Sequence, residues 1–141
     1  MTDIWLISDP HFGHKIAARE RGFEHVAEHD RALIRNCRKV FREKSQVYWL
    51  GDMAFGGWEA KLREVMPQLP GEHHLILGNH DRAHPLNPQG ERHQIRFYRL
   101  GFSSVSMAGQ LRYEGQKVLL SHFPYDGDHT YTERHTQWRL R

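Results

Sequence analysis

The chain has 141 residues, which is the size of one domain and too short for two independent hydrophobic cores. Its formal net charge is +3, and its Lys and Arg residues are scattered, which excludes the basic run typical of a nucleic-acid-binding tail. A single cysteine excludes an intramolecular disulfide, and neither a signal peptide nor a membrane-spanning stretch is visible. We therefore expect a soluble, cytoplasmic protein with no membrane partner.

Strands and helices alternate in the first half of the predicted structure. An apolar strand over residues 4–8 ends before a proline, and a helix over 24–41 follows, with apolar side chains at three- and four-residue intervals. A second strand over 47–50 leads to a second helix around 62–69 and then to a third strand over 75–77. Two such crossovers predict a parallel sheet with right-handed connections, and hence an α/β fold.

The second half of the sequence has a different pattern. Residues 82–91 contain two prolines and a glycine and predict a long surface loop, a feature that is often functional. Short strands are expected over 105–108, 111–113 and 117–121, with a hairpin turn between the last two. This half is therefore predicted to be more antiparallel than the first.

Short polar clusters follow directly on predicted strands. These clusters are Asp9-Pro10-His11, Gly51-Asp52, Gly78-Asn79-His80-Asp81 and Ser121-His122. Strands that enter a sheet from the same side deliver their carboxyl ends to one edge, where ligands and catalytic groups collect. Each cluster alone is explained equally well as a turn, a cap or an edge histidine. Their joint occurrence after strands predicts a metal site made of carboxylate, imidazole and amide groups.

Several residues in these clusters suit particular tasks. Asp9 and His11 are separated by one residue and can offer an oxygen and a nitrogen to one cation. Asp52 follows a glycine that lets the backbone approach a ligand, and its two carboxylate oxygens can bridge two metals. His80 has a titratable ring, and Asp81 is an acceptor that can fix the tautomer of that ring.

The ordered set of Asp, His, Asp, Asn and His resembles the calcineurin-like metallophosphoesterase family. The opening Ile7-Ser8-Asp9-Pro10-His11-Phe12-Gly13-His14 is similar to that of its small bacterial and phage-type members, and the resemblance covers nearly the whole chain. It implies two mixed β-sheets packed as a sandwich and flanked by helices. We expect residues 1–141 to form a single domain of this kind that lacks the C-terminal strand.

The resemblance also implies a metal-dependent phosphoesterase with two divalent cations, for which we expect Mn²⁺, with Fe²⁺, Zn²⁺ or Ni²⁺ as alternatives. Asp9 and His11 would bind the first cation, Asn79 and His122 would bind the second, and Asp52 would bridge the two. The implied reaction is in-line attack of a metal-bridging hydroxide on a phosphate ester. A phosphodiester is favoured as substrate, such as a cyclic nucleotide or a nucleic-acid strand.

Two further roles are implied by the same resemblance. His80 would assist departure of the leaving oxygen, and Asp81 would hold the ring of His80. One departure concerns the final family motif, Gly-His-x-His, which supplies one histidine to each metal and which no segment of this chain matches. The later histidines His129 and His135 have the wrong separation and do not follow an apolar strand. We therefore expect the chain to be incomplete at its C-terminus.

The remaining histidines have simpler explanations. His14 lies close in sequence to the first cluster and would either reach the substrate phosphate or a nearby carboxylate, or begin a helix at the surface. His73 and His74 precede the third predicted strand and are expected at the surface and the edge of the sheet.

The alternative function is a non-catalytic scaffold of the same fold that binds nucleic acid or a protein partner through basic residues. The candidates for this contact are Arg82, Arg92, Arg96 and Arg99. Scattered cations usually only solvate a surface, so we rank the enzyme first. Strong salt-dependent DNA binding without metal-dependent turnover would favour the scaffold.

Overall fold

A four-stranded parallel sheet organises the computed structural model, which describes residues 2–124. Its order is β1-β2-β3-β4, with the strands β1 (Ile4–Ile7), β2 (Gln46–Trp49), β3 (Glu72–Ile76) and β4 (Phe102–Ser106). All three neighbouring pairs are parallel, so every strand delivers its carboxyl end to the same edge. Side chains alternate between faces, and Val47 and Trp49 of β2 are fully buried as a result.

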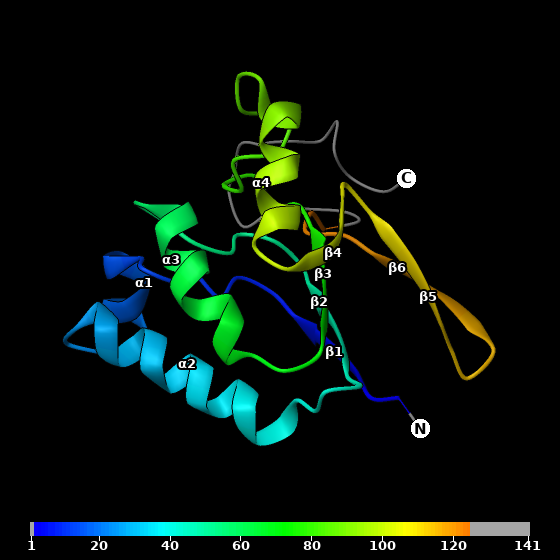
Figure 1. The fold of residues 1–141 in the computed structure, drawn as a ribbon, viewed down its shortest axis with the longest axis horizontal. Coiled ribbons are helices and arrows are strands. Elements are labelled where there is room, and N and C mark those ends of the chain that lie inside the picture. Colours follow the sequence, from blue (N-terminus) through cyan, green and yellow to red (C-terminus); the bar gives the residue numbers. More distant parts are fainter. Residues whose placement is uncertain (1, 125–141) are drawn as a thin grey trace.

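Helices make the connections between these strands. They are α1 (Lys15–Glu20), α2 (Val26–Val40), α3 (Trp58–Val65), η1 (Met66–Gln68), η2 (Gly90–His93) and α4 (Gln94–Arg99). A second sheet is the antiparallel hairpin of β5 (Gly109–Tyr113) and β6 (Gln116–Leu120). Figure 1 shows α1, α2 and α3 on one side of the four-stranded sheet and the hairpin on the other.

Helix α2 packs on the sheet because its apolar side chains recur on one face. Ala32 and Ile34 of this helix are buried, and Cys37 packs against the core from a half-buried position. The centre of that core consists of fully buried side chains, namely Phe12, Trp49, Leu62, Leu75 and Leu77. Phe12 comes directly after His11, so the core anchors the loop that follows β1.

The α/β class and the parallel order of the first three strands confirm the expectation from sequence. The largest differences in strand bounds are at β3 and β4, which begin at Glu72 and Phe102, earlier than predicted. Because β4 is parallel to β3, the antiparallel prediction for the second half holds only for β5 and β6. The expectation that His73 lies at the surface is wrong, since its side chain is 4% exposed within β3.

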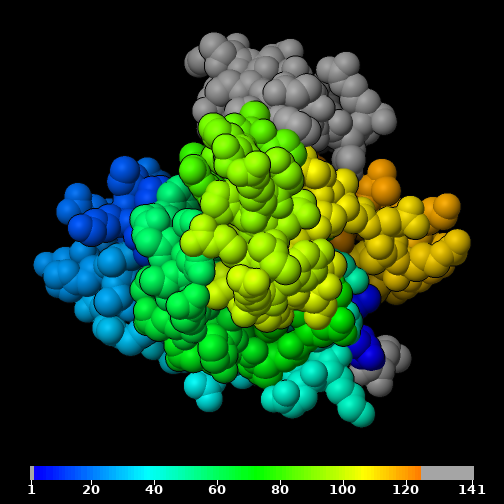
Figure 2. Space-filling model, turned by 45° about the horizontal axis from the view of Figure 1, so that its top comes forward, coloured from blue at the N-terminus to red at the C-terminus, as the bar shows by residue number. Residues whose placement is uncertain are grey.

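The hairpin turn is confirmed, with Glu114 and Gly115 both at positive φ, which matches the right-handed twist of the flanking strands. Figure 2 shows the hairpin projecting from the body of the molecule, away from α1 and the start of α2. The hairpin is exposed along its length, with Tyr113 beside the turn and Leu119 near the other end each 61% accessible. Over the described residues, no helix combines the length and the apolar character needed to cross a membrane.

Candidate metal and catalytic centre

The four polar clusters meet at the carboxyl edge of the parallel sheet. The loop after β1 is bound to the loop after β2, because the N–H of Asp9 donates to the carbonyl of Gly51 and the N–H of His11 donates to that of Asp52, both at 3.1 Å. His122, which follows β6, reaches the same place, with its Nδ1 2.7 Å from the carbonyl oxygen of Leu50. Asp9 and His122, which are 113 positions apart in the sequence, therefore share one site.

Three candidate ligands have a left-handed backbone, which is uncommon outside glycine. The φ angles are 54° at Asp9, 53° at His11 and 57° at Asp52. Such conformations cost about 1–3 kcal/mol each and cluster at functional sites, where the surrounding structure holds them in place. Here the hydrogen bonds between the two loops supply part of that support.

Asp52 occupies the centre of the cluster. Its Oδ2 lies 3.7 Å from Nε2 of His11, and its Oδ1 lies 3.8 Å from Nε2 of His122. His11 Nε2 is also 3.3 Å from Oδ1 of Asp9, and one ligand atom each from Asp9, Asp52 and His122 lie within 4.8 Å of one another. One carboxylate thus faces a histidine on each of its two oxygens.

The ligand atoms around His122 suit a cation. In the neutral ring, Nδ1 carries the proton and donates it to Leu50, which leaves a lone pair on Nε2. That nitrogen lies 3.0 Å from Oδ1 of Asn79, which is also an acceptor. Two acceptors that face each other beside the Asp52 carboxylate are a favourable set of ligands for a divalent cation.

The electrostatics of the cluster keep its carboxylates ionised. Burial alone would raise the pKa of Asp52, but the hydrogen bond with His11 and the charges of His122 and His80 hold that pKa below its ordinary value. Burial alone would lower the pKa of His11, but the hydrogen bonds with Asp52 and Asp9 raise it to about 9. A cation that binds His11 must therefore displace a proton.

Asp81 has a different environment from the one expected. Its carboxylate accepts three backbone N–H groups, from Gly78 at 2.8 Å and from Asp52 and Met53 at 2.9 Å. The ring of His80 is not among these partners. Asp81 instead binds the backbone of two loops, the one after β2 and the one after β3. Burial raises its pKa to about 6, against the opposing effect of the N–H donors.

His80 lies beside the cluster with its ring exposed. Its backbone N–H donates to Oδ1 of Asp52 at 3.0 Å, which fixes the position of the residue relative to the candidate ligands. The ring is 5.1 Å from that of Phe55, a residue that the sequence reasoning does not single out. Phe55 also stacks on His14 at 4.1 Å, and Nδ1 of His14 lies 3.0 Å from Nδ1 of His11.

Two glycines let the loops approach each other this closely. A Cβ added at Gly51, where φ is 92°, would lie 2.5 Å from the backbone nitrogen of Gly78. A Cβ added at Gly78 would lie 2.3 Å from Oδ1 of Asp52. Any side chain at Gly78 would therefore displace the central carboxylate.

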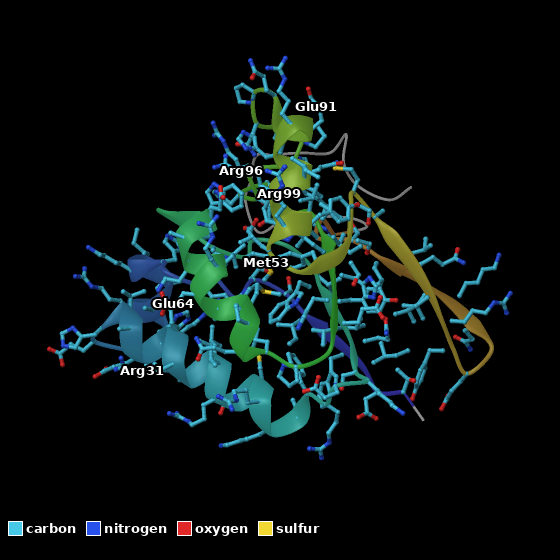
Figure 3. The ribbon with its side chains drawn as sticks, viewed as in Figure 1. Arg31, Met53, Glu64, Glu91, Arg96 and Arg99 are labelled. Carbon is cyan, nitrogen blue, oxygen red and sulfur yellow. The ribbon has the colours of Figure 1, made fainter. Side chains whose placement is uncertain are left out.

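Three basic residues of the scaffold alternative, Arg92, Arg96 and Arg99, lie in η2 and α4, whereas Arg82 directly follows Asp81. Figure 3 labels Arg96 and Arg99 on α4, and Met53, which directly follows Asp52. Arg96 forms an ion pair with Glu59 and lies over the ring of Trp58, with 5.3 Å between the guanidinium carbon and the ring centre.

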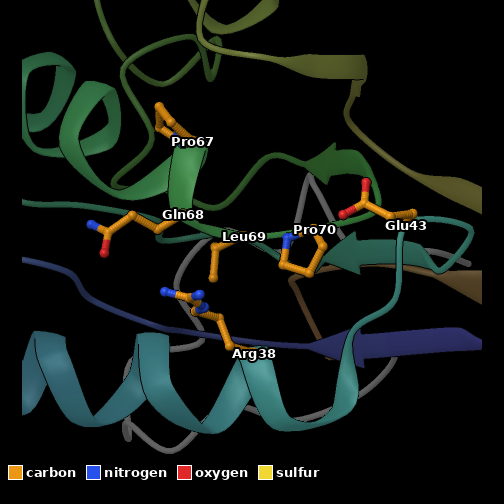
Figure 4. Close-up of a pocket in the computed structure, with 6 residues that line it drawn as sticks. All are labelled: Arg38, Glu43, Pro67, Gln68, Leu69 and Pro70. Carbon is orange, nitrogen blue, oxygen red and sulfur yellow. The ribbon is translucent and has the colours of Figure 1, made fainter.

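A pocket lies at the other edge of the sheet. Figure 4 shows this cavity of about 570 Å³, which is lined by Arg38, Glu43, Pro67, Gln68, Leu69 and Pro70. Its residues precede β2 and β3, so it opens at the amino ends of the strands. The polar clusters and this pocket are therefore separate features.

His129 and His135 lie outside the described residues.

Comparisons with known proteins show which family the chain resembles. The family model for calcineurin-like phosphoesterases matches residues 2–139. The Gene 66 protein of Mycobacterium phage L5 is 38% identical over 151 residues, which cover 100% of this chain and 72% of that protein. The Gene 66 protein of Mycobacterium phage D29 is 40% identical over 148 residues, with 100% and 73% covered.

Similar proteins also come from Methanocaldococcus jannaschii and Aquifex aeolicus. The uncharacterized protein MJ1445 of Methanocaldococcus jannaschii is 35% identical over 141 residues, covering 98% of this chain and 66% of that protein. The crystal structure of the protein of unknown function AQ665 from Aquifex aeolicus is similar with a TM-score of 0.72 and 25% identity, covering 98% of this chain and 68% of that one. The chain belongs to the calcineurin-like phosphoesterase family. Membership implies a hydrolase that acts on phosphate esters with the help of divalent metals.

Proposed function

We propose that the protein is a phosphodiesterase that depends on two divalent cations, with Mn²⁺ as the expected metal. The observation that carries this proposal is the meeting of Asp9, Asp52 and His122, whose ligand atoms lie within 4.8 Å of one another. When bound, divalent cations polarise phosphoryl oxygens and lower the pKa of water, which supplies a nucleophile at neutral pH.

The side chains divide into two groups around Asp52. Asp9 and His11 would hold one cation and Asn79 and His122 the other, with Asp52 as the shared ligand. The distances of 3.7 and 3.8 Å from its two oxygens to the two histidines support this division. The left-handed backbone at Asp9, His11 and Asp52 supports it as well, because strain of this kind accumulates where function requires it.

His80 would give a proton to the leaving oxygen. Its exposed ring can reach a substrate, while its backbone N–H remains tied to Asp52 at 3.0 Å. A well-placed general acid contributes about a hundred- to ten-thousandfold in rate. Asp81 would act indirectly, since it positions the backbone of Asp52 and Gly78 and does not face the substrate.

The experiment that tests this proposal compares two chromogenic substrates. Purified full-length chain is assayed with bis-p-nitrophenyl phosphate and with p-nitrophenyl phosphate, each with added Mn²⁺ and with a chelator. The proposal predicts Mn²⁺-dependent hydrolysis that is faster with the diester, and no such activity in Asp52→Asn. Faster hydrolysis of the monoester would overturn the diester assignment, and turnover that survives the chelator would overturn metal dependence.

A further inference from the structure

A buried group of polar side chains lies behind the loop that contains Asp9 and His11. His29 is fully buried and Asp30 is 4% exposed, although both belong to α2 rather than to any of the polar clusters. Buried ionisable side chains are retained only where hydrogen bonds or ion pairs satisfy them. Their partners therefore indicate what they hold in place.

Asp30 holds the far end of the loop. Both of its carboxylate oxygens accept the backbone N–H of Gly13, each at 3.1 Å, and Lys61 of α3 pairs with Oδ2 at 3.1 Å. Gly13 has a φ of 76°, which is the left-handed region again. One carboxylate thus connects α2 and α3 to the residue at which the loop turns towards α1.

Arg21 and His29 hold the near end of the loop. The guanidinium of Arg21 only donates hydrogen bonds, so its contact of 2.9 Å with Nε2 of His29 makes that nitrogen the acceptor. The ring proton then lies on Nδ1, which donates to Oδ1 of Asp30 at 3.0 Å. Arg21 also donates to the carbonyl oxygens of Pro10 at 3.0 Å and Asp9 at 2.8 Å.

Packing alone does not support this side of the loop. A pocket of about 190 Å³ lies beside it, and Ser8, Asp9, Pro10 and Arg21 are among the residues that line it. A left-handed backbone at non-glycine residues persists only where the surroundings fix it. The hydrogen bonds that Arg21 donates to the loop and that Asp30 accepts from it meet that requirement on the side where side-chain packing is incomplete.

We propose that Arg21, which follows α1, and His29 and Asp30 of α2 are positioning residues for the metal centre. We call these three residues the α2 relay. The relay fixes the backbone on both sides of His11 and so sets the direction in which the Asp9 carboxylate and the His11 ring point. This inference rests on the proposed function, because it gives the relay a task in metal binding. The ligands themselves would not change when the relay is removed, only their orientation.

The test uses Arg21→Gln, because the Arg21 side chain is exposed and its removal leaves no hole in the core. Arg63→Gln is the matched control, since Arg63 is also exposed and pairs with Glu59 away from the loop. Calorimetry measures Mn²⁺ binding to the full chain, and amide hydrogen exchange without metal measures protection at Gly13. Urea denaturation confirms that each variant is folded.

We expect Arg21→Gln to weaken Mn²⁺ binding by about ten- to a hundredfold, the usual effect of removing a group that orients metal ligands. Exchange at Gly13 should become faster, and Arg63→Gln should leave both quantities unchanged. Asp30→Asn should change both in the same direction as Arg21→Gln. If Asp30→Asn does not fold, Arg21→Gln still decides the matter.

Wild-type Mn²⁺ affinity together with wild-type exchange at Gly13 in Arg21→Gln would overturn the inference. Equal losses in Arg21→Gln and Arg63→Gln would overturn it too, because the effect would then be one of general surface charge. An unmodified chain that binds no Mn²⁺ would refute the proposed function and, with it, the metal-binding task of the relay. Amide exchange at Gly13, measured without metal, would then still show whether the relay fixes the loop. Faster exchange in Arg21→Gln would mean that it does, and unchanged exchange that it does not.

Discussion

The carboxylate of Asp81 accepts the backbone N–H of Asp52 at 2.9 Å and so ties the loop after β3 to the loop after β2. The same carboxylate accepts the N–H groups of Gly78 and Met53. If the Asp81 carboxylate were removed, these N–H groups would lose their acceptor. Because Asp81 is 3% exposed, no water molecule would take its place. The position of Asp52, the central candidate ligand, therefore depends on Asp81, which is not itself a candidate ligand.

Asp81→Asn should destabilise the protein and weaken metal binding. The amide has one acceptor oxygen in place of two and turns an NH₂ group towards a backbone N–H, so we expect a loss of about 1–3 kcal/mol in the free energy of unfolding. Urea denaturation measures this loss, and calorimetry with Mn²⁺ measures the affinity. Glu64→Gln, at an exposed position on α3, is the control. An Asp81→Asn variant with wild-type stability would contradict this account.

Asp52→Asn and His80→Ala should separate binding from turnover. Asp52→Asn removes the charge between the two histidines and should abolish Mn²⁺ binding and activity together. His80→Ala removes only a ring that is exposed beside the cluster, so Mn²⁺ affinity should stay near the wild-type value while kcat falls about a hundred- to ten-thousandfold. Calorimetry and steady-state kinetics on both variants provide the comparison. Equal loss of metal in the two variants would refute these roles.

Gly78→Ala should disable the site through a steric clash. The new Cβ would lie 2.3 Å from Oδ1 of Asp52, and the contact is with backbone and carboxylate atoms that have little freedom to move. We expect Mn²⁺ affinity to fall at least tenfold, in line with loss of ligand orientation. Gly57→Ala is the control, because a Cβ there meets no atom within 4 Å. Similar affinities for the two variants would show that close contact between the loops is not needed.

The buried ring of His73 predicts a loss of stability in mild acid. Its Nδ1 accepts the indole N–H of Trp49 at 3.0 Å and its Nε2 faces the carbonyl of Leu69, so the ring is neutral. Burial lowers its pKa below the ordinary value of 6.5. Below that pH the unfolded chain binds a proton that the native ring does not, so the free energy of unfolding decreases as pH falls through 6.5 towards the native pKa.

The control for this pH effect is His73→Gln, whose amide can donate and accept but does not titrate. Urea denaturation at about pH 7.5 and pH 5 should show a smaller loss of stability for the variant than for the wild type. If both proteins lose the same amount, the acid sensitivity comes from other groups. A His73→Gln variant that loses more stability in acid than the wild type would contradict the neutral, buried state of the ring.

The sequence alone predicts the elements whose signals are local. The strands that end at Asp9 and Asp52 are recognisable because an apolar run stops at polar residues, and the hairpin is recognisable from Glu114 and Gly115. Helix α4 is missed and α1 is anticipated only by the alternative that His14 begins a helix, because each has six residues, too few for a helical period to appear.

Other features depend on contacts between distant residues. His73 is buried because Trp49, from the neighbouring strand, supplies a donor for it, and no pattern within β3 indicates that partner. Likewise, the relay from Arg21 through His29 to Asp30 exists only once α2 has packed beside the loop after β1. Asp9 and Asp52 are recognisable as candidate ligands from their place after strands, but their left-handed backbone is a property of the assembled loops.

The most direct test of the central claim is a crystal structure of the full chain with Mn²⁺, with anomalous scattering used to locate the ions. The account predicts two anomalous peaks at the carboxyl edge of the sheet, with the carboxylate of Asp52 bound to both. Asp9 should contact one of these peaks and His122 the other. Anomalous density elsewhere on the protein, with none beside Asp52 at saturating Mn²⁺, would contradict it.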